Sequence, residues 1–171
     1  EALACFDRMQ CEGLSPNDIT FLCVLNACSQ SGLVDEAEMH FMNMGEIYGI
    51  KPNLEHHTWM VLIFASVGDF DKAMSVIKAM PSAEYAAVWV ALLGACRKWG
   101  NLKLGKLAFD QVLQLDNCCV EAYVLMANIF AAYGMVKDAD NVQSVRLKYA
   151  PSEKEVNNVW ASTSVNAHLE I

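Results

Sequence analysis

The chain has 171 residues, of which 54% are hydrophobic and 19% are charged. This balance excludes an intrinsically disordered segment, and no apolar run reaches the roughly 20 residues that a membrane-spanning helix needs. The net charge of -8 argues against binding to nucleic acid or to an anionic membrane through bulk charge, so any RNA binding must come from specific side chains. With only 4 Pro and 9 Gly, helices are favoured over many short strands.

A six-residue motif recurs along the chain, at Gly32–Ala37, Gly68–Ala73 and Gly134–Ala139, and Gly100–Gly105 keeps the same frame. The starting glycines are 36, 32 and 34 residues apart. A period near 34 is typical of stacked helix-turn-helix units. Each glycine ends one helix with a positive φ, and apolar residues of helical period lie on both sides of it.

These signals predict one lone helix followed by four antiparallel helix pairs. The lone helix is expected at 1–12, the first helices of the pairs at about 18–30, 54–66, 86–98 and 120–133, and the second helices at about 34–46, 70–79, 102–115 and 136–149. Before two of the first helices, a Pro stops the preceding segment and an Asn, Asn17 or Asn53, is placed to cap the next helix. The predicted fold class is therefore an all-α, right-handed α-solenoid of antiparallel helix-turn-helix repeats.

Cysteine and histidine residues offer no metal or catalytic constellation. The seven cysteines are odd in number and form no Cys-x-x-Cys pair, which predicts free thiols in a reducing compartment. Those in apolar helical stretches are expected to be buried (Cys5, Cys11, Cys23, Cys28 and Cys96), and the adjacent pair between two helix pairs is expected at the surface (Cys118 and Cys119). Adjacent helical residues such as His56 and His57 point about 100° apart, so we interpret them as hydrogen-bonded histidines at a helix start. No phosphate-binding loop or nucleophile motif is present, and the sequence predicts neither an enzyme nor a cofactor.

Several stretches in one order resemble the pentatricopeptide repeat (PPR) family. They are Pro16–Phe21, Val24–Ser29, Tyr48–Asn53, Leu54–His57, Val88–Trp89 with Leu92–Arg97, and Ala122–Leu125 with Asn128–Ala131. The closest likeness is to the plant class in which P, L and S repeats alternate and end in E motifs. On this resemblance the chain divides into the end of a P repeat (1–17), an L repeat (18–53), an S repeat (54–85), a first E motif (86–119), a second E motif (120–153) and a tail (154–171). Since the chain does not open with Met, we also expect it to belong to a longer protein.

The resemblance implies binding of single-stranded organellar RNA, with one base per repeat, and recognition of cytidines for C-to-U editing. The family reads bases with the fifth and last residues of each repeat, which here are Asn17, Leu22, Asn53, Thr58 and Tyr85. Leu22 cannot hydrogen-bond to a base and is better interpreted as a core or helix-face residue, whereas Tyr85 either stacks on a base or packs in a seam. Editing in this family needs a DYW deaminase domain, of which His168–Glu170 matches only half a motif, so that activity is expected to follow in the chain or to be recruited in trans.

The E motifs also resemble tetratricopeptide repeats, which bind proteins, and this leaves a protein-protein scaffold as the alternative function. An editing cofactor or a deaminase is then the expected partner, and the exposed solenoid ends predict self-association. One cationic cluster stands out in the acidic chain, and it faces RNA phosphate, an acidic partner or only solvent (Arg97, Lys98, Lys103 and Lys106). The expected location is a mitochondrion or a chloroplast, with the mitochondrion preferred.

Overall fold

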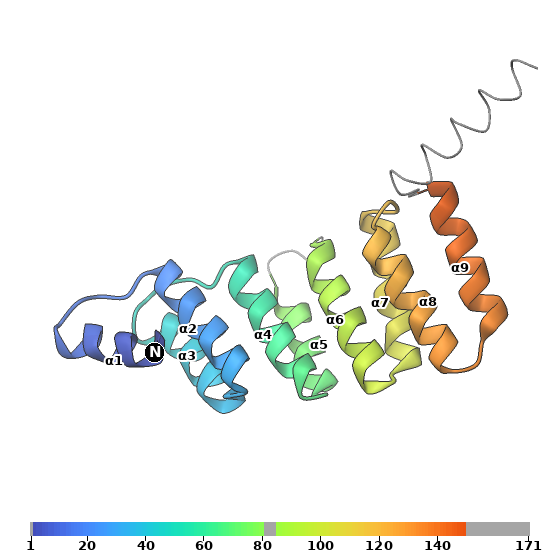
Figure 1. The fold of residues 1–171 in the computed structure, drawn as a ribbon. Coiled ribbons are helices and arrows are strands. Elements are labelled where there is room, and N and C mark those ends of the chain that lie inside the picture. Colours follow the sequence, from blue (N-terminus) through green and yellow to red (C-terminus); the bar gives the residue numbers. More distant parts are fainter. Residues whose placement is uncertain (1, 81–84, 150–171) are drawn as a thin grey trace, which may run out of the picture. The chain divides into compact units, whose positions relative to one another are not determined.

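The structure is a computed structural model that describes residues 2–80 and 85–149, and these parts fold into nine α-helices (Figure 1). In chain order they are α1 (Ala2–Cys11), α2 (Asp18–Ser31), α3 (Val34–Glu46), α4 (Leu54–Ser66), α5 (Phe70–Ala79), α6 (Ala86–Trp99), α7 (Leu102–Leu115), α8 (Val120–Ala132) and α9 (Val136–Tyr149). The expected helices agree with these bounds to within one residue, and the helical-repeat fold is confirmed. The expected tail and His168–Glu170 lie outside the described residues.

Asparagine side chains start α2 and α4, as the sequence predicts. The Oδ1 atom of Asn17 accepts a hydrogen bond from the Thr20 amide at 2.9 Å, and the Thr20 hydroxyl accepts one from the Asn17 amide at 3.3 Å. At α4, Oδ1 of Asn53 accepts from the amides of Glu55 and His56 at 3.0 and 3.1 Å. Such caps satisfy amides that a helix leaves unpaired, and each stabilises the fold by about 1 kcal/mol.

Glycine ends the first helix of a pair where the chain turns back. Gly32 has φ 69°, and its amide contacts the carbonyl groups of Cys28 and Ser29 at the end of α2. Residues with a Cβ rarely adopt this left-handed conformation, which explains why the repeated motif begins with glycine.

Two glycine substitutions should therefore have opposite effects on stability. Gly32→Ala is expected to lower the free energy of unfolding by about 1–2 kcal/mol, because alanine rarely adopts the positive φ of this residue. A Cβ at Gly32 would meet no atom within 4 Å, so steric overlap adds nothing to this loss. Gly45→Ala, inside α3 and also with open space for a Cβ, should raise it by about 0.5–1 kcal/mol. Urea titrations of both variants measure this, and effects of the same sign would contradict the assignment of the turn.

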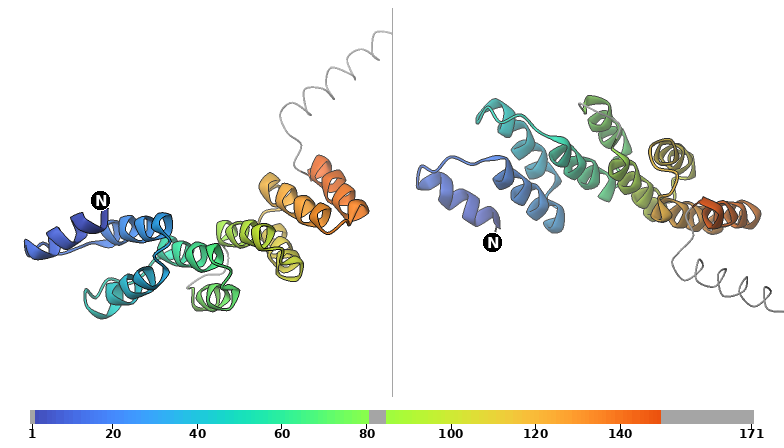
Figure 2. Two further views of the ribbon diagram at one scale, coloured as in Figure 1. Left: turned by 60° about the horizontal axis from the view of Figure 1, so that its bottom comes forward. Right: turned by 90° about the horizontal axis from the view of Figure 1, so that it is seen from above.

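The described helices form two compact units, Glu1–Ala95 and Cys96–Ile171, with the division inside α6. In the first unit α2 packs on α3 and α4, and α4 packs in turn on α5, while α1 contacts α2. Figure 2 shows that α2 and α4 form one layer of this unit, and α3 and α5 the other. In the second unit α8 packs between α7 and α9.

An aromatic cluster holds the N-terminal part of the first unit together. Phe21 of α2 is fully buried, and its ring centroid lies 5.6 Å from that of Phe6 in α1 and 5.4 Å from that of Tyr48, beyond the end of α3. Both pairs are edge-to-face, the geometry that aromatic quadrupoles favour. Phe21 thus joins three segments of the chain in one core.

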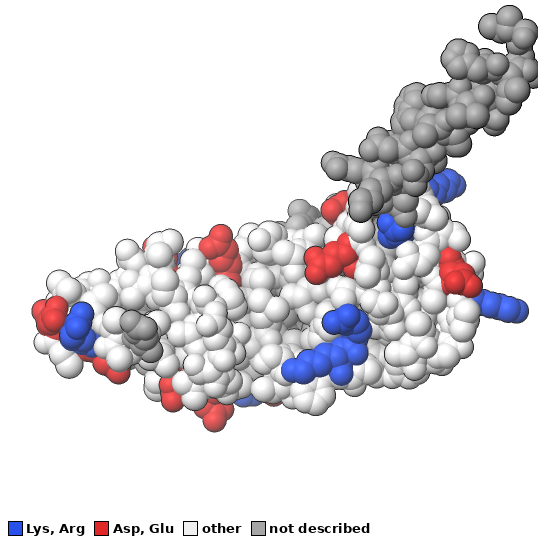
Figure 3. All heavy atoms as spheres, viewed as in Figure 1, with Lys and Arg blue, Asp and Glu red and all other residues white. Residues whose placement is uncertain are grey.

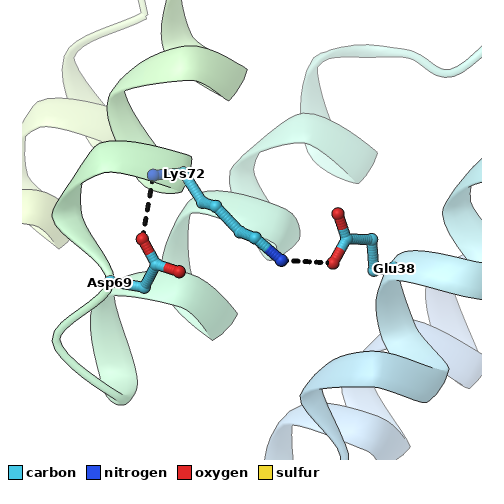
Figure 4. A network of polar contacts seen from close by, with 3 residues as sticks. All are labelled: Glu38, Asp69 and Lys72. Carbon is cyan, nitrogen blue, oxygen red and sulfur yellow. Dashed lines mark hydrogen bonds and ion pairs between the residues drawn. The ribbon is translucent and has the colours of Figure 1, made fainter.

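A polar contact joins the second helices of neighbouring pairs in the same unit. The Nζ atom of Lys72 in α5 lies 2.7 Å from Oε2 of Glu38 in α3, and the Lys72 amide donates to the capping carboxylate of Asp69 at 3.0 Å (Figure 4). Both charged side chains are partly exposed, so solvent screens the ion pair and weakens its contribution to stability. The ion pair thus connects α3 to α5 at the surface of the first unit.

The core of the second unit is centred on Tyr123 of α8, which is 1% exposed. Its hydroxyl donates to the Asn117 carbonyl at 2.9 Å, and its ring lies edge-on to Phe109 of α7 at 5.5 Å between centroids. Burial raises the pKa of this tyrosine above its ordinary value. One side chain therefore fixes the loop before α8 and the packing of α8 on α7.

The seven cysteines are free, but the expectation of burial was wrong for Cys5, Cys11 and Cys23, which are exposed. Cys118 is exposed and Cys119 is partly exposed, in line with the expected surface thiols. Only Cys28 and Cys96 are buried. Cys5 and Cys23 line a groove of about 490 Å³ between α1 and α2, where no described side chain covers them. Helical period placed them on apolar faces, but an apolar face is buried only where a neighbouring helix packs on it.

Thiol labelling should separate the two buried cysteines from the rest. Burial raises the pKa of the Cys96 thiol to about 12 and also raises that of Cys28, so neither forms the reactive thiolate near neutral pH. With a maleimide at pH 8, mass spectrometry should find Cys23 and the other exposed cysteines modified in the folded protein, and Cys28 and Cys96 modified only in urea. Equal labelling rates for Cys96 and Cys23 in the folded protein would contradict this core.

Within residues 2–80 and 85–149, no helix has the length and apolar character needed to cross a lipid bilayer.

Candidate nucleic-acid interface

The expected base-reading residues lie at or near the starts of α2, α4 and α6, each the first helix of its helix pair. Asn17 precedes α2, Asn53 precedes α4, and Tyr85 directly precedes α6, while Leu22 and Thr58 lie in the second turns of α2 and α4. Since α2 packs beside α4 and both begin at the same edge of the first unit, Leu22 and Asn53 belong to neighbouring helix starts (Figure 1). The five residues thus follow one edge of that unit.

Asn17 and Asn53 have a second role that limits how they can contact a base. Their Oδ1 atoms are occupied by capping bonds, including the short contact of 2.6 Å between Asn53 Oδ1 and the Nδ1 atom of His56. The Nδ2 groups take no part in these bonds, and both asparagines are exposed. Each asparagine therefore presents a hydrogen-bond donor to a ligand at this edge.

Thr58 is half-buried, and its hydroxyl donates to the Leu54 carbonyl at 2.8 Å. A hydroxyl whose proton is used in this way still has lone pairs, so Thr58 can accept a hydrogen bond from a base. Leu22 is also half-buried and offers only apolar contact, whereas Tyr85 is 37% exposed. The edge thus combines donors, one acceptor and an exposed tyrosine.

His56 supports this edge in a way that the sequence did not reveal. It is fully buried, and its Nε2 atom lies 3.0 Å from the carbonyl oxygen of Asp18 in α2. The bond ties the start of α4 to the start of α2 and so fixes Asn53 relative to the first turn of α2. Burial lowers the pKa of His56, and its hydrogen bond to Asp18 opposes this in part.

The two adjacent histidines are hydrogen-bonded residues at a helix start, as expected. His57 is buried, its Nδ1 atom lies 2.8 Å from the Asn53 carbonyl oxygen, and its ring packs edge-on against Phe41 at 5.2 Å. Among the described residues, no group of three or more His, Cys, Asp or Glu could hold a metal ion.

The cationic cluster belongs to the second unit. Arg97 and Lys98 lie in the last turn of α6, Lys103 and Lys106 lie in the first two turns of α7, and all four are exposed. Figure 3 shows cationic side chains gathered at the lower centre of the view with no acidic side chain among them. The Nζ atom of Lys106 lies 5.3 Å from the ring centroid of Phe130 in α8. The base-reading candidates and the cationic cluster are therefore parts of different units.

Comparisons with known proteins agree on one family. The sequence model of the family described as the pentacotripeptide-repeat region of PRORP matches residues 1–103. Among Arabidopsis thaliana proteins, a mitochondrial pentatricopeptide repeat-containing protein is 38% identical over 168 residues, covering 96% of this chain and 25% of its own length. A second pentatricopeptide repeat-containing protein is 35% identical over 175 residues, covering 100% of this chain and 20% of its own length. A third, also named mitochondrial, is 38% identical over 145 residues, covering 85% of this chain and 24% of its own length. The chain thus spans about a fifth to a quarter of these relatives.

Proposed function

Because the chain belongs to the pentatricopeptide repeat family, whose members generally bind RNA in organelles, we propose that it recognises bases of single-stranded RNA along the starts of its first helices. The observation that carries the proposal is that Asn17 and Asn53 are both exposed at one edge of the first unit, with Nδ2 groups that take no part in the capping bonds. In helical repeats of this kind, two or three side chains read one base. Leu22 with Asn53, and Thr58 with Tyr85, are the proposed reading pairs.

The proposed outcome is recognition of a site for C-to-U editing, in an organelle that we take to be the mitochondrion. Two relatives are named mitochondrial, which supports the location. The L repeat (18–53), the S repeat (54–85) and the two E motifs (86–119 and 120–153) remain proposed divisions. In this reading the repeats bind and position the RNA, and a deaminase domain elsewhere in the protein or in a partner performs the reaction.

Base selection by the full-length protein tests this function. Asn53→Asp keeps an oxygen for the helix cap but replaces the donor group that faces a base, so folding should be unchanged. We expect the preferred base at one position of a randomised RNA pool to change by about tenfold or more, since one good base contact contributes about 1–3 kcal/mol of discrimination. Thr58→Val should weaken preference at the neighbouring position.

Two control variants separate base reading from charge and from helix stability. Asn141→Asp adds the same charge on the exposed face of α9, and Ser75→Ala removes a hydroxyl that bonds the Asp71 carbonyl at 2.9 Å in α5, as Thr58 does in α4. Neither should change base preference at near-physiological salt. Unchanged preference in both Asn53→Asp and Thr58→Val would contradict the proposed reading pairs.

A protein-protein scaffold is the second candidate, and the overall charge of -8 together with the apolar Leu22 at a reading position favours it. The proposed partner of such a scaffold is an editing cofactor or a deaminase bound by the helix pairs at 86–153. A scaffold function is also consistent with self-association through the ends of the solenoid. Purification distinguishes the two functions, because a scaffold retains a protein partner in fixed ratio and selects no RNA.

A further inference from the structure

The turn between α6 and α7 concentrates positive charge in an otherwise acidic chain. Residues 97–106 contain four Lys or Arg and no Asp or Glu, although the whole chain has a net charge of -8. Favourable interaction with the helix dipole accounts for Arg97 at the end of α6. It does not account for Lys103, because a cation in the first turn of a helix is unfavourable. Folding alone therefore leaves part of this cluster unexplained.

Two large aromatic side chains are exposed at the same turn. Trp99 at the end of α6 and Tyr133 at the end of α8 are each 49% exposed. The Tyr133 hydroxyl donates to the carbonyl of Gly100, the residue next to Trp99, and so holds its ring against the turn. Neither ring lies in a core, and the Nζ atom of Lys98 lies 5.3 Å from the ring centroid of Trp99.

We propose that this surface, formed by Arg97, Trp99, Lys103 and Tyr133, is a second contact for single-stranded RNA. The cations bind phosphates and the two rings stack on bases, the combination by which proteins hold a single strand without reading its sequence. An acidic peptide would satisfy the cations but would leave the rings without a matching partner, and therefore RNA is the occupant. The inference rests on the proposed function. The surface adds affinity for RNA, whereas base selection remains with the first unit.

Binding of the full-length protein to a single-stranded RNA of its preferred sequence, measured by fluorescence anisotropy at several salt concentrations, tests the proposal. Arg97→Gln with Lys103→Gln should reduce the slope of log affinity against log salt by about 1.4, since each phosphate contact on a single strand contributes about 0.7. Trp99→Ala should weaken binding about tenfold, and Trp99→Phe should recover most of the loss because a ring is retained. Base preference at the position read by Asn53 should stay the same in all of them.

Lys137→Gln is the matched control, because it removes an exposed cation of the same unit from α9. It should leave both affinity and salt slope close to those of the unsubstituted protein. Thermal unfolding of each variant establishes that it folds.

Different outcomes overturn different claims. If the unsubstituted protein binds RNA but the variants at Arg97, Lys103 and Trp99 keep its affinity and salt slope, the second contact is wrong and the proposed function stands. If the unsubstituted protein binds no RNA, both are wrong. A polyglutamate peptide whose binding is lost in these variants, while RNA binding is retained, would also overturn the inference and identify an acidic protein surface as the ligand.

Discussion

Replacement of Phe21 by Ala is expected to lower the free energy of unfolding by about 3–5 kcal/mol, the usual range for a buried phenylalanine. The side chain is fully buried, and its ring contacts both Phe6 and Tyr48, so the substitution leaves a cavity bordered by three segments. Urea unfolding followed by far-ultraviolet circular dichroism measures the change.

Ile19→Ala is the control for this prediction, because Ile19 lies two residues earlier in the same helix and is 59% exposed. It should change stability by no more than about 0.5 kcal/mol. Similar losses in the two variants would contradict the position of α2 in the first unit.

The second large effect concerns pH, through two histidines of the first unit. Burial lowers the pKa of His56 and of His40 from the ordinary value of 6.5, against the opposing charges of neighbouring carboxylates. The folded protein therefore favours neutral imidazoles. Their contribution to stability is complete above pH 6.5 and declines as pH falls below it, since the unfolded chain binds protons first.

Each such histidine should make the free energy of unfolding fall by up to about 1.4 kcal/mol per pH unit below pH 6.5. Urea midpoints and m-values at pH 7.5, 6.5 and 5.8 measure the slope. His56→Gln should be less stable at pH 7.5, because its hydrogen bond to the Asp18 carbonyl is altered, and should show a smaller slope. His40→Gln should likewise reduce the slope. If neither variant changes the slope, other groups control the acid response.

Local patterns in the sequence were enough to predict the helices and their ends. Gly32 and its counterparts mark the turns by their need for a positive φ, and Asn17 and Asn53 mark helix starts by their capping side chains. Each of these signals depends only on residues within four or five positions of one another, so the local sequence is enough to predict the helix end.

Contacts between segments far apart in the chain could not be predicted in this way. The bond from His56 to the Asp18 carbonyl joins residues 38 positions apart, and no local pattern specifies it. Cys5 and Cys23 are exposed because no described helix covers the groove between α1 and α2. The periodicity of a helix shows which face is apolar but does not show whether another helix packs on that face. The proposed base-reading edge was identified by family resemblance, whereas the hydrogen bond by which His56 supports it emerged only from the packing.

The capping role of Asn53 restricts which residues can occupy this proposed base-reading position. A side chain there must supply an oxygen to the first amides of α4, which limits the choice largely to Asn, Asp, Ser and Thr. Asn and Asp differ in the group left for the ligand, a donor in one and an acceptor in the other. We therefore expect an Asn-to-Asp exchange to change the proposed base preference with little effect on folding, whereas residues outside this set should weaken the start of α4.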